Sequence, residues 1–414
     1  LQRLFQLIEK GSRYLNIESG ELEMKAYGGS LFDSDLHPKL EKWKFNNKSL
    51  LETIKQLVRV QDGKNRSFVN YASIEVRHIG TVYEKLLEFH PEKENGKIVI
   101  FNKKGKKESE GTYYTPKYIV DNIVENALGP IVDKIIEENP SKNDQIEKIL
   151  SLKILDPAMG SGHFLVEAAN YLGNRIQKIG SEKEFVEIKR EIVRRCLYGV
   201  DINPLSVELA KMSLWLDTLS KDHALSFLAT HLKNGDSIVG ATREEMESGK
   251  FSTKVGGKKI THDDGQTTLG FEDYSKTKFR EFVKKYLKFE TWSDDDASIV
   301  KGKINDEIKT RGRDTDYDKL KYLLDIQISK FYGKEIKYWL DLRAKIGKKD
   351  FPNSKDKDWE EVRKIADKER FFHYDLEFPQ VFCDLEGNRL ENPGFDVILG
   401  NPPYGVKYEG EYFE

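Results

Sequence analysis

The chain has 414 residues, of which 38% are hydrophobic and 33% charged, and its formal net charge at pH 7 is −2. This length predicts two or three domains, and the composition is polar but sufficient to build a hydrophobic core. A net charge so close to zero excludes a uniformly basic chain, so any surface that binds nucleic acid must be local.

Cysteine and histidine usage argues against metal and disulfide chemistry. The two cysteines, Cys196 and Cys383, fit no metal-binding or redox spacing and suit a reducing compartment. The eight histidines include no His-x-x-x-His pair, so we predict no metal site. No stretch of the sequence approaches the roughly 20 apolar residues of a membrane span. We therefore expect a cytoplasmic protein without a membrane-spanning helix.

Residues 1–110 are predicted to form an N-terminal helical domain. Apolar residues recur at three-and-four spacing in "LQRLFQLIEKGSRYL", "KSLLETIKQLVRV" and "YASIEVRHIGTVYEKLLEF". The alternating "GKIVIFN" and the "KKGKK" that follows it predict a hairpin that turns at these lysines. The lysines of residues 103–107 could contact a phosphate backbone, but a solvated turn is the favoured interpretation.

Strands and helices are predicted to alternate over residues 111–240. A helix is expected from Pro116, and "LKILDPAMGSGHFLVEAANYL" and "CLYGVDINPLSVELAKMSLWL" each predict a strand, a turn and a helix. "HLKNGDSIVG" adds a short third strand, and the alternation predicts a parallel, doubly wound α/β sheet. Residues 241–370 are expected to be a mostly helical insertion, too long for a plain loop. The strand pattern returns at "GFDVILGNPPY", within residues 371–414.

An acidic residue follows each of the first three predicted strands of this sheet. Asp156 precedes a turn with Gly160 and Gly162, Asp201 ends the second strand, and Asp236 follows the third. The glycines permit a tight turn and a close approach to a ligand, although such a turn can also be a simple connection. A carboxylate in this turn suits a cationic ligand, and an acid at the second strand tip can accept from both ribose hydroxyls. Together the acids favour a binding site over isolated caps and turns.

The last predicted strand leads into Asn401-Pro402-Pro403-Tyr404. Proline fixes φ and removes an N–H donor, so this loop is expected to be rigid and to present carbonyl groups. The Asn401 side-chain oxygen and the Pro402 carbonyl can both accept from one amino group, which stabilises positive charge as it develops on that nitrogen. The ring of Tyr404 can stack on a planar base. An ordinary proline-rich turn is the alternative, and the upstream acids disfavour it.

Five motifs in a fixed order carry a resemblance to a known family. The motifs "TYYTP", "LDPAMGSG", "GVDINP", "NGDS" and "FDVILGNPPY" resemble those of gamma-class DNA methyltransferases that form N6-methyladenine. "AYGGSLFD", "IEVRHIGTVYEKLLEF" and "FFHYDLEFPQVF" further resemble the methyltransferase part of type IIG restriction–modification enzymes and related phage-defence methyltransferases. The resemblance covers most of the chain and is weakest over residues 241–365. It implies a Rossmann-like fold and methyl transfer from S-adenosylmethionine to a flipped adenine in double-stranded DNA, with restriction or defence subunits as candidate partners.

The resemblance also implies a role for each motif residue. The methionine end of the cofactor would be contacted by Thr115, Asp156, Ala158, Met159, Gly160 and Gly162. The rest of the cofactor would be held by Asp201 at the ribose, Ile202 on the adenine face, Asp236 with Ser237 at the adenine edge, and Pro403. The catalytic residues would be Asn401 and Pro402, which hold the target amino group, and Tyr404, which stacks on the flipped base.

Two departures from the family and two alternatives accompany this interpretation. In the family, three more strands and a target-recognition domain follow the catalytic strand, and the residues after Tyr404 are too few to form them. We therefore expect a fragment with an incomplete sheet and without specific DNA recognition, and no nuclease motif is readable. The alternatives are a protein glutamine methyltransferase, which also uses Asn-Pro-Pro-Tyr, and a non-catalytic cofactor-binding module of a defence complex.

Overall fold

The structure is a computed structural model, and it describes residues 46–62, 65–70, 89–94, 97–102, 115–218, 228–248, 251–255, 258–262, 271–288, 297–332, 351 and 357–402. A parallel four-stranded sheet has the order β10-β5-β6-β7 and consists of β5 (Ile154–Asp156), β6 (Leu197–Asp201), β7 (Leu232–Asn234) and β10 (Val397–Ile398). Strand β5 lies between β6 and β10, so the direction of winding reverses at β5. This sheet with its flanking helices confirms the predicted α/β fold class.

The strand register aligns the carboxyl ends of the strands at one edge of the sheet. Asp156 at the end of β5 is opposite Gly199 of β6, and Asp201 at the end of β6 is opposite Asn234 of β7. Strand β10 pairs with β5 through Val397 and Ile398. The loops that follow all four strands therefore leave the sheet on the same side, where ligands bind in open α/β sheets.

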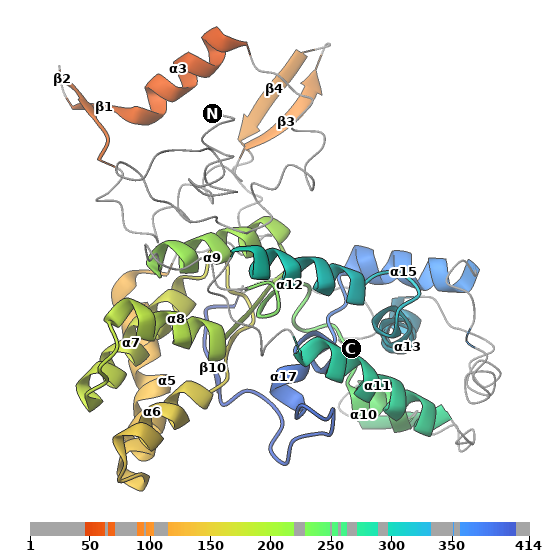
Figure 1. Cartoon of the computed structure of the whole chain (residues 1–414). Helices are drawn as coiled ribbons and strands as arrows, with labels where there is room; N and C mark the ends of the chain where they lie inside the picture. Colours follow the sequence, from red (N-terminus) through yellow and green to blue (C-terminus); the bar gives the residue numbers. More distant parts are fainter. Residues whose placement is uncertain are drawn as a thin grey trace.

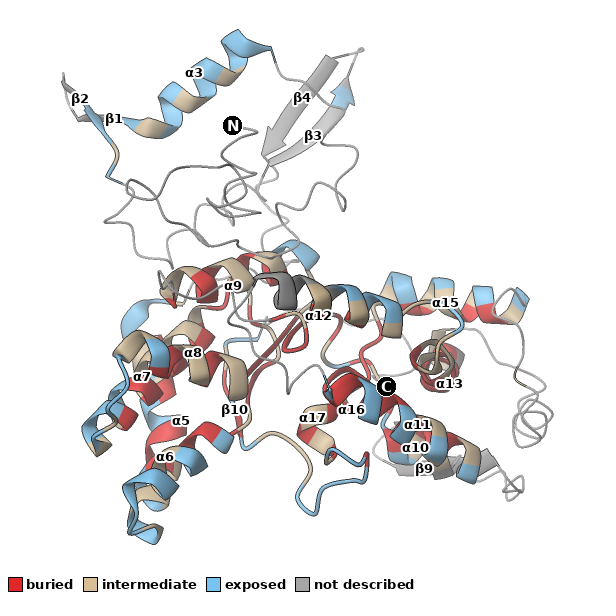
Figure 2. Ribbon diagram, in the orientation of Figure 1, coloured by how far each residue is buried: buried red, intermediate tan, exposed pale blue. Residues whose placement is uncertain are grey.

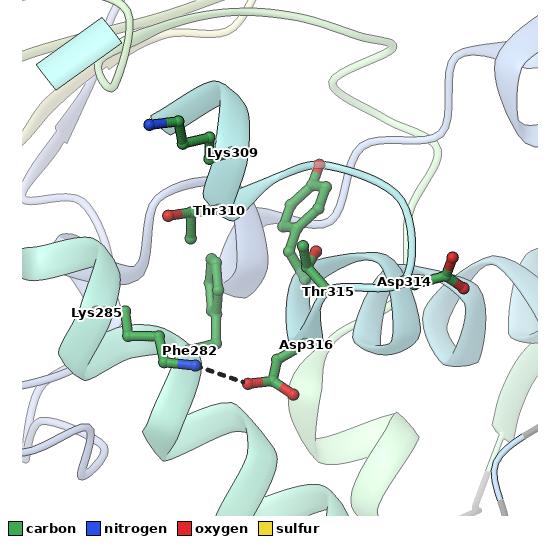
Figure 3. Close-up of a pocket in the computed structure, with 8 residues that line it drawn as sticks. Phe282, Lys285, Lys309, Thr310, Asp314, Thr315 and Asp316 are labelled. Atoms are coloured by element: carbon green, nitrogen blue, oxygen red, sulfur yellow. Dashed lines mark hydrogen bonds and ion pairs between the residues drawn. The ribbon is translucent and has the colours of Figure 1, made fainter. Parts of the chain in front are cut away.

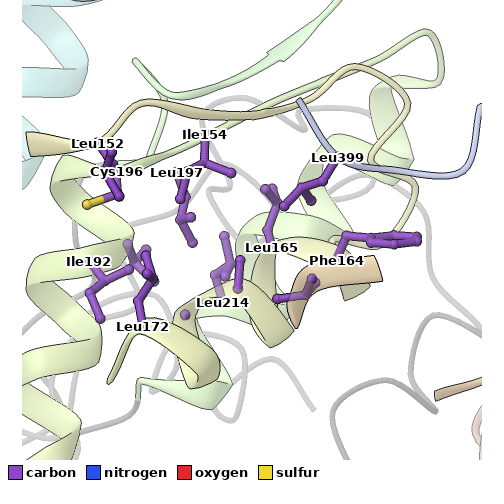
Figure 4. Packing of buried hydrophobic residues seen from close by; sticks show 14 of the residues in the cluster. Leu152, Ile154, Phe164, Leu165, Leu172, Ile192, Cys196, Leu197, Leu214 and Leu399 are labelled. Carbon is purple, nitrogen blue, oxygen red and sulfur yellow. The ribbon is translucent and has the colours of Figure 1, made fainter. Parts of the chain in front are cut away.

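One face of the sheet is covered by a layer of helices (Figure 1). The helices of residues 115–218 are α5 (Lys117–Glu138), α6 (Lys142–Ser151), α7 (His163–Ile179), α8 (Phe185–Arg195) and α9 (Pro204–Asp217). Their core is the largest cluster of buried residues in the described chain, and Figure 4 shows Leu165, Leu172 and Leu214 facing Ile154 and Leu197 of the sheet. Each fully buried Leu or Ile contributes about 1.5–3 kcal/mol, so this layer is the main source of stability for the sheet.

The other face of the sheet is covered by a short segment from near the end of the chain. Leu155, Tyr198 and Val200 alternate in sequence with the residues that face the helices, and they form a separate small core with Phe372 and Phe378. The segment contains the short helices α16 (Tyr374–Glu377) and α17 (Pro379–Phe382). The "FFHYDLEFPQVF" motif thus has a structural role as the second layer over the sheet, and Figure 2 shows α16 with buried residues in red.

Residues 241–370 contain helices, as expected, and a hairpin that was not expected. The described elements are α10 (Arg243–Ser248), β8 (Phe251–Val255), β9 (Lys258–His262), α11 (Phe271–Leu287), α12 (Ala297–Thr310), α13 (Asp316–Ser329), the 3-10 helix η4 (Lys330–Tyr332) and α15 (Lys357–Glu369). The helices have their own core, in which the Trp359 ring stacks on Tyr322 at 4.3 Å between centroids. The domain boundaries proposed from the sequence remain predictions.

The described part of the first 110 residues contains one helix and four strands. These are α3 (Asn47–Val58), β1 (Arg59–Asp62), β2 (Asn65–Phe68), β3 (Phe89–Glu94) and β4 (Lys97–Asn102). The predicted hairpin turn at the lysines lies outside the described residues, and the hairpin that the structure describes pairs "KIVIFN" with "FHPEKE" before it. Asn95 and Gly96 separate the two strands, a pair of residues that favours two-residue hairpin turns. The helices predicted before residue 46 and over residues 71–88 lie outside the described residues.

Within the ranges that the structure describes, none of the helices combines the length and the apolar character needed to cross a membrane.

Candidate active site

The glycine turn after β5 joins the first two acidic residues of the sheet edge. Gly160 has a φ of 53°, and its N–H donates to Asp201 Oδ2 at 2.8 Å. Gly162 is the N-cap of α7 with a φ of 83°, and a Cβ there would lie 3.1 Å from the Cβ of Ala210. Glycine is therefore required at both positions, by backbone conformation at Gly160 and by conformation and space at Gly162. The turn brings β5, β6 and α9 together.

Met159 lies in the same turn, but its side chain packs into the core. It is buried, and a Cβ added to Gly199 would collide with its sulfur atom. Its N–H donates to the Val200 carbonyl at 3.0 Å. Met159 can therefore contribute backbone to a ligand site, whereas its side chain supports the turn from below. Ala158 is half-buried beside it, and its N–H donates to Asp156 Oδ1 at 3.1 Å.

Asp156 is a buried carboxylate that lacks a counter-charge. Its exposed fraction is 0%, and its Oδ2 atom has no hydrogen-bond partner among the described residues. Burial raises the pKa of Asp156 to about 7, the Ala158 N–H acts in the opposite direction, and the negative charge of Asp201 raises the pKa further. A cationic group at Oδ2 would relieve both the desolvation and the missing hydrogen bond.

Asp201 is placed at the tip of β6 with both carboxylate oxygens in use by backbone donors. Besides Gly160, the N–H of Asn203 donates to it, at 2.8 Å from Oδ1. Burial raises the pKa of Asp201, although both of these hydrogen bonds lower it. The side chain of Ser206 also forms a hydrogen bond with this carboxylate. A carboxylate has about four acceptor positions, so about one remains for a ligand's hydroxyl group. The next residue, Ile202, is 55% exposed and offers an apolar surface beside the carboxylate.

The turn after β7 carries Asp236 and Ser237. Asp236 Oδ1 accepts from the N–H of Ile238 at 3.0 Å, and burial raises the pKa of Asp236. Ser237 forms a side-chain hydrogen bond with Tyr374, and burial is the main reason why the pKa of this tyrosine rises to about 12. The Asp236 carboxylate retains acceptor capacity, while the Ser237 side chain is already engaged with α16.

Strand β10 brings the Asn-Pro-Pro-Tyr loop to the same edge. Gly400 has a φ of 154°, and a Cβ there would lie 2.6 Å from Asp156 Oδ1, so only glycine fits against this carboxylate. The side-chain amide of Asn401 donates from Nδ2 to Thr115 Oγ1 at 3.0 Å, across 286 positions of sequence. This contact leaves Asn401 Oδ1 as an acceptor. Pro402 is exposed next to it, while Pro403 and Tyr404 lie outside the described residues.

Three further residues belong to this edge and were not singled out from the sequence. Asn234 donates from Nδ2 to the carbonyls of Asp201 and Ile202, at 2.7 and 2.9 Å. Arg370 donates to the Ile202 carbonyl, and Gly400 makes the close approach to Asp156. Asn234 and Gly400 are next to quoted motif residues, so their positions could have been noticed. No sequence signal indicated Arg370, which precedes the "FFHYDLEFPQVF" motif.

The described residues contain no group of three or more His, Cys, Asp or Glu side chains placed to bind a metal ion. A separate pocket of about 390 Å³ lies among α11, α12 and α13 (Figure 3) and is lined by Phe282, Lys285, Lys309, Thr310, Asp314, Thr315, Asp316 and Tyr317. Lys285 and Asp316 form an ion pair at 3.2 Å in this pocket. None of the residues predicted for the site lines it.

Comparisons with known proteins match this chain to DNA methylases and methyltransferases. The family model for N-6 DNA methylase matches residues 78–283. A Methanocaldococcus jannaschii protein, named as a type II restriction enzyme and methyltransferase, is 26% identical over 369 residues, which cover 79% of this chain and 30% of the relative. The Escherichia coli adenine-specific methyltransferase BrxX is 27% identical over 165 residues, 34% of this chain and 13% of the relative.

A further relative is the Escherichia coli type II restriction enzyme and methyltransferase RM.Eco57I, 29% identical over 161 residues, 33% of this chain and 15% of the relative. The matched part of the chain thus spans less than a third of the length of each of these relatives. The family model for Eco57I restriction-modification methylase matches residues 195–413, which is more than half of the chain. The chain belongs to the Eco57I restriction-modification methylase family.

Proposed function

We propose that this chain binds S-adenosylmethionine at the carboxyl edge of its sheet and takes part in methyl transfer to N6 of adenine in double-stranded DNA. The observation that carries the proposal is the contact between Gly400 and the Asp156 carboxylate. Gly400 precedes Asn401, so the contact supports an Asn401 loop close to the buried acid at the tip of β5. The names of the relatives, which include adenine-specific methyltransferases, support the reaction and the substrate.

The residues of the edge fit S-adenosylmethionine in charge and in shape. The unpartnered Oδ2 of Asp156 suits the positively charged methionine end, where Thr115 and the backbone of Ala158, Gly160 and Gly162 also lie. The remaining acceptor position of Asp201 suits a ribose hydroxyl. Beyond them, Ile202 offers its exposed side chain to the adenine face. When bound, S-adenosylmethionine supplies an electrophilic methyl group on a cationic sulfur.

The adenine end of the cofactor would meet the turn after β7. The Asp236 carboxylate can accept from the exocyclic amino group of the adenine, because the Ile238 N–H uses only part of its acceptor capacity. Ser237 would frame the edge of the ring from the position that its bond to Tyr374 fixes. Met159 would contribute backbone only, and Pro403 would border the cofactor from the loop.

The Asn401 loop would hold the target amino group of the substrate. Asn401 Oδ1 is free to accept because Nδ2 is directed to Thr115, and the Pro402 carbonyl supplies a second acceptor. Two acceptors on the N6 hydrogens favour a lone pair on nitrogen and stabilise the positive charge that develops there. The amino group of a stacked base is out of reach, so the adenine must leave the duplex, and Tyr404 would stack on it.

Double-stranded DNA is therefore the proposed macromolecular partner, and the cytoplasm of a bacterium or archaeon is the proposed location, because that compartment contains the substrate DNA. The names of the relatives support a setting in restriction–modification or phage defence, with the subunits of such a system as candidate partners. The role of a protein glutamine methyltransferase remains the competing proposal that a test must separate.

The test is methyl transfer from labelled S-adenosylmethionine to adenine-containing duplex DNA, with a glutamine-bearing protein as the competing acceptor. The chain is used in excess over DNA so that slow transfer is detected. We expect label on adenine N6, lowered about 100-fold or more in Asn401→Ala because a transition-state acceptor is lost. Asn388→Ala is the control, since Asn388 is an exposed residue bonded only locally to Asp384.

Three results would contradict the proposal in different ways. Label on the protein would support a glutamine methyltransferase instead. Cofactor binding without transfer to either acceptor would support a non-catalytic module. Equal transfer by the wild type and by Asn401→Ala would remove Asn401 from the reaction.

A further inference from the structure

Arg370 has a backbone conformation that few residues adopt. It is one of two non-glycine residues with positive φ in the described ranges, at 56°, and the other is Asp314 at 61°. A side chain in this conformation is strained, and the strain persists only where the surrounding structure imposes it. Arg370 follows α15 directly and precedes Phe371, so the strained residue stands where the chain passes from the insertion back to the sheet.

The contacts of Arg370 converge on the tips of β6 and β7. Its backbone carbonyl accepts from the N–H of Asp236 at 2.8 Å. Its guanidinium donates to the Ile202 carbonyl and lies 3.5 Å from Asn234 Oδ1. Since Asn234 donates to the Asp201 and Ile202 carbonyls as well, the turn at residues 201–202 is held from two sides.

The position of Arg370 depends on the insertion. The N–H of Phe371 donates to the Ala366 carbonyl in α15 at 3.0 Å. Helix α15 is itself anchored by Trp359, Val362 and Ala366, all buried in the core of the insertion. A shift of this helix would therefore move Arg370 and release the Ile202 carbonyl.

The charge of Arg370 acts on the same turn. Burial is the largest influence on the pKa of Asp201 and raises it, while the positive charge of Arg370 lowers it. The guanidinium thus favours the ionised carboxylate, the form in which both oxygens act only as acceptors and can receive a hydroxyl group of the ribose.

We infer that Arg370 is a positioning residue for the nucleoside half of the cofactor, and that through it the insertion determines whether the Asp201–Ile202 turn can bind this half. The inference rests on the proposed function. Arg370 acts through the backbone of Ile202 and through Asn234, not by contact with the reacting atoms. It makes nucleoside binding depend on α15, which is remote in sequence from both strand tips.

The test is a calorimetric titration of the 414-residue chain with two probes. S-adenosylmethionine contains both halves of the cofactor, whereas 5′-methylthioadenosine contains only the nucleoside half. The variant is Arg370→Gly, because glycine adopts positive φ readily and only the side chain is lost. Asp314→Gly is the matched control, since it relaxes the other strained position, in the insertion and away from the edge. Asp156→Asn reports separately on the methionine half.

We expect Arg370→Gly to lower the affinity for both probes by a similar factor of about ten, the size expected for a lost charged hydrogen bond. Arg370→Lys should recover part of the loss, because it restores the positive charge. Asp314→Gly should bind both probes as the wild type does, and Asp156→Asn should weaken only S-adenosylmethionine. A merely structural role for Arg370 would instead lower the melting temperature without this pattern.

Two outcomes would overturn the inference and are distinguishable. If Arg370→Gly binds both probes as tightly as the wild type, the positioning role is wrong while the proposed function stands. If the folded wild-type chain binds neither probe, the proposed function is wrong and this inference falls with it. A loss confined to S-adenosylmethionine would also overturn the inference, because it would place Arg370 at the methionine half.

Discussion

Two groups of buried charges in this molecule have opposite electrostatic character. At the sheet edge, burial raises the pKa of Asp156 to about 7 and also raises that of Asp201. At the contact between β7 and the insertion, burial would raise the pKa of Glu377, but the charges of Arg311 and Lys233 outweigh it and lower the pKa to about 2. Burial acts on the carboxylates of both groups, but only in the second group do neighbouring cationic side chains outweigh it.

The second group is a closed network of ion pairs. Lys233 of β7 pairs with Glu307 of α12 at 2.8 Å, and Arg311 pairs with Glu377 of α16. The hydroxyl of Tyr317 donates to Glu377 at 2.6 Å. This network holds β7, α12 and α16 together, because its positive and negative side chains pair with one another. A buried carboxylate without a cationic partner among the described residues, as Asp156 is, is a physical reason to expect a ligand instead.

The largest effect should come from opening the network. Glu377→Gln removes the nearer anionic partner of the half-buried Arg311 and leaves it Glu307 at 3.7 Å, so we expect a loss of about 3 kcal/mol in the free energy of unfolding. Urea denaturation measures it. The control is Glu386→Gln, which breaks the exposed pair with Lys284 and should cost less than about 1 kcal/mol. Equal losses for the two variants would remove the contrast between the network and ordinary surface pairs.

Gly400→Ala should cause the next largest loss of stability, because it tests how closely the Asn401 loop approaches Asp156. The added Cβ would meet Asp156 Oδ1 at 2.6 Å in a conformation that already disfavours a side chain. We expect a loss of about 2–3 kcal/mol in unfolding free energy. Gly394→Ala is the matched control, since Gly394 also has positive φ, at 133°, but nothing lies within 4 Å of its Cβ position. Thermal unfolding that gave both variants the same melting temperature would argue against the close approach.

Asp156→Asn should stabilise the protein, whereas most substitutions of a buried residue destabilise it. Because the pKa of Asp156 is raised by folding, the stability contributed by its protonated form is fully present below the pKa of the unfolded chain, near 3.8. This contribution is lost as the pH rises through about 7. Asparagine avoids this ionisation, so the variant should exceed the wild type by roughly 2–4 kcal/mol at pH 8 and lose the advantage near pH 4. Melting temperatures across this pH range measure the difference. A wild-type profile parallel to that of the variant would show that Asp156 has a cation partner already.

Thr115→Val should have the smallest effect on folding and a selective effect on the reaction. The exposed hydroxyl that orients Asn401 is lost, so we expect about a tenfold slower methyl transfer at saturating cofactor. Thr115→Ser keeps the hydroxyl and should restore most of the rate. Single-turnover transfer to duplex DNA measures both variants. If Thr115→Val were as fast as the wild type and Thr115→Ser were slow, the methyl group of Thr115, and not its hydroxyl, would be the relevant feature.

The sheet and its acidic edge could be predicted because their signals are local. Each strand is a short apolar run, and Asp156 and Asp201 end two of them, so parallel pairing alone places these acids at one edge. The glycine turn was recognisable because Gly160 and Gly162 adopt conformations that other residues avoid. The hairpin of β3 and β4 was not predicted, because its first strand, with Pro91 and three charged residues, lacks an apolar alternation.

The rest of the site depends on contacts between distant segments, which no local pattern encodes. Arg370 reaches Ile202 across 168 positions, and Asn401 reaches Thr115 across 286. The core position of the Met159 side chain follows from its packing on Gly199 of another strand. The closed ion network around Glu377 likewise combines residues from four elements. The sequence predicted only a mostly helical insertion around Glu307 and Arg311, because the burial of these side chains is decided by the tertiary fold.

The central claim is that Asp156, unlike the paired carboxylates around Glu377, is left for a cationic ligand. The most direct test is whether the sheet edge binds a cation at Asp156. Calorimetric titration of the chain with S-adenosylmethionine at pH 7, in two buffers of different ionisation enthalpy, measures both affinity and proton release. Because a bound cation lowers a pKa that burial had raised to about 7, the account predicts binding with release of about half a proton, lost in Asp156→Asn. Binding without proton release and unaffected by Asp156→Asn, or no binding by the folded chain, would contradict it.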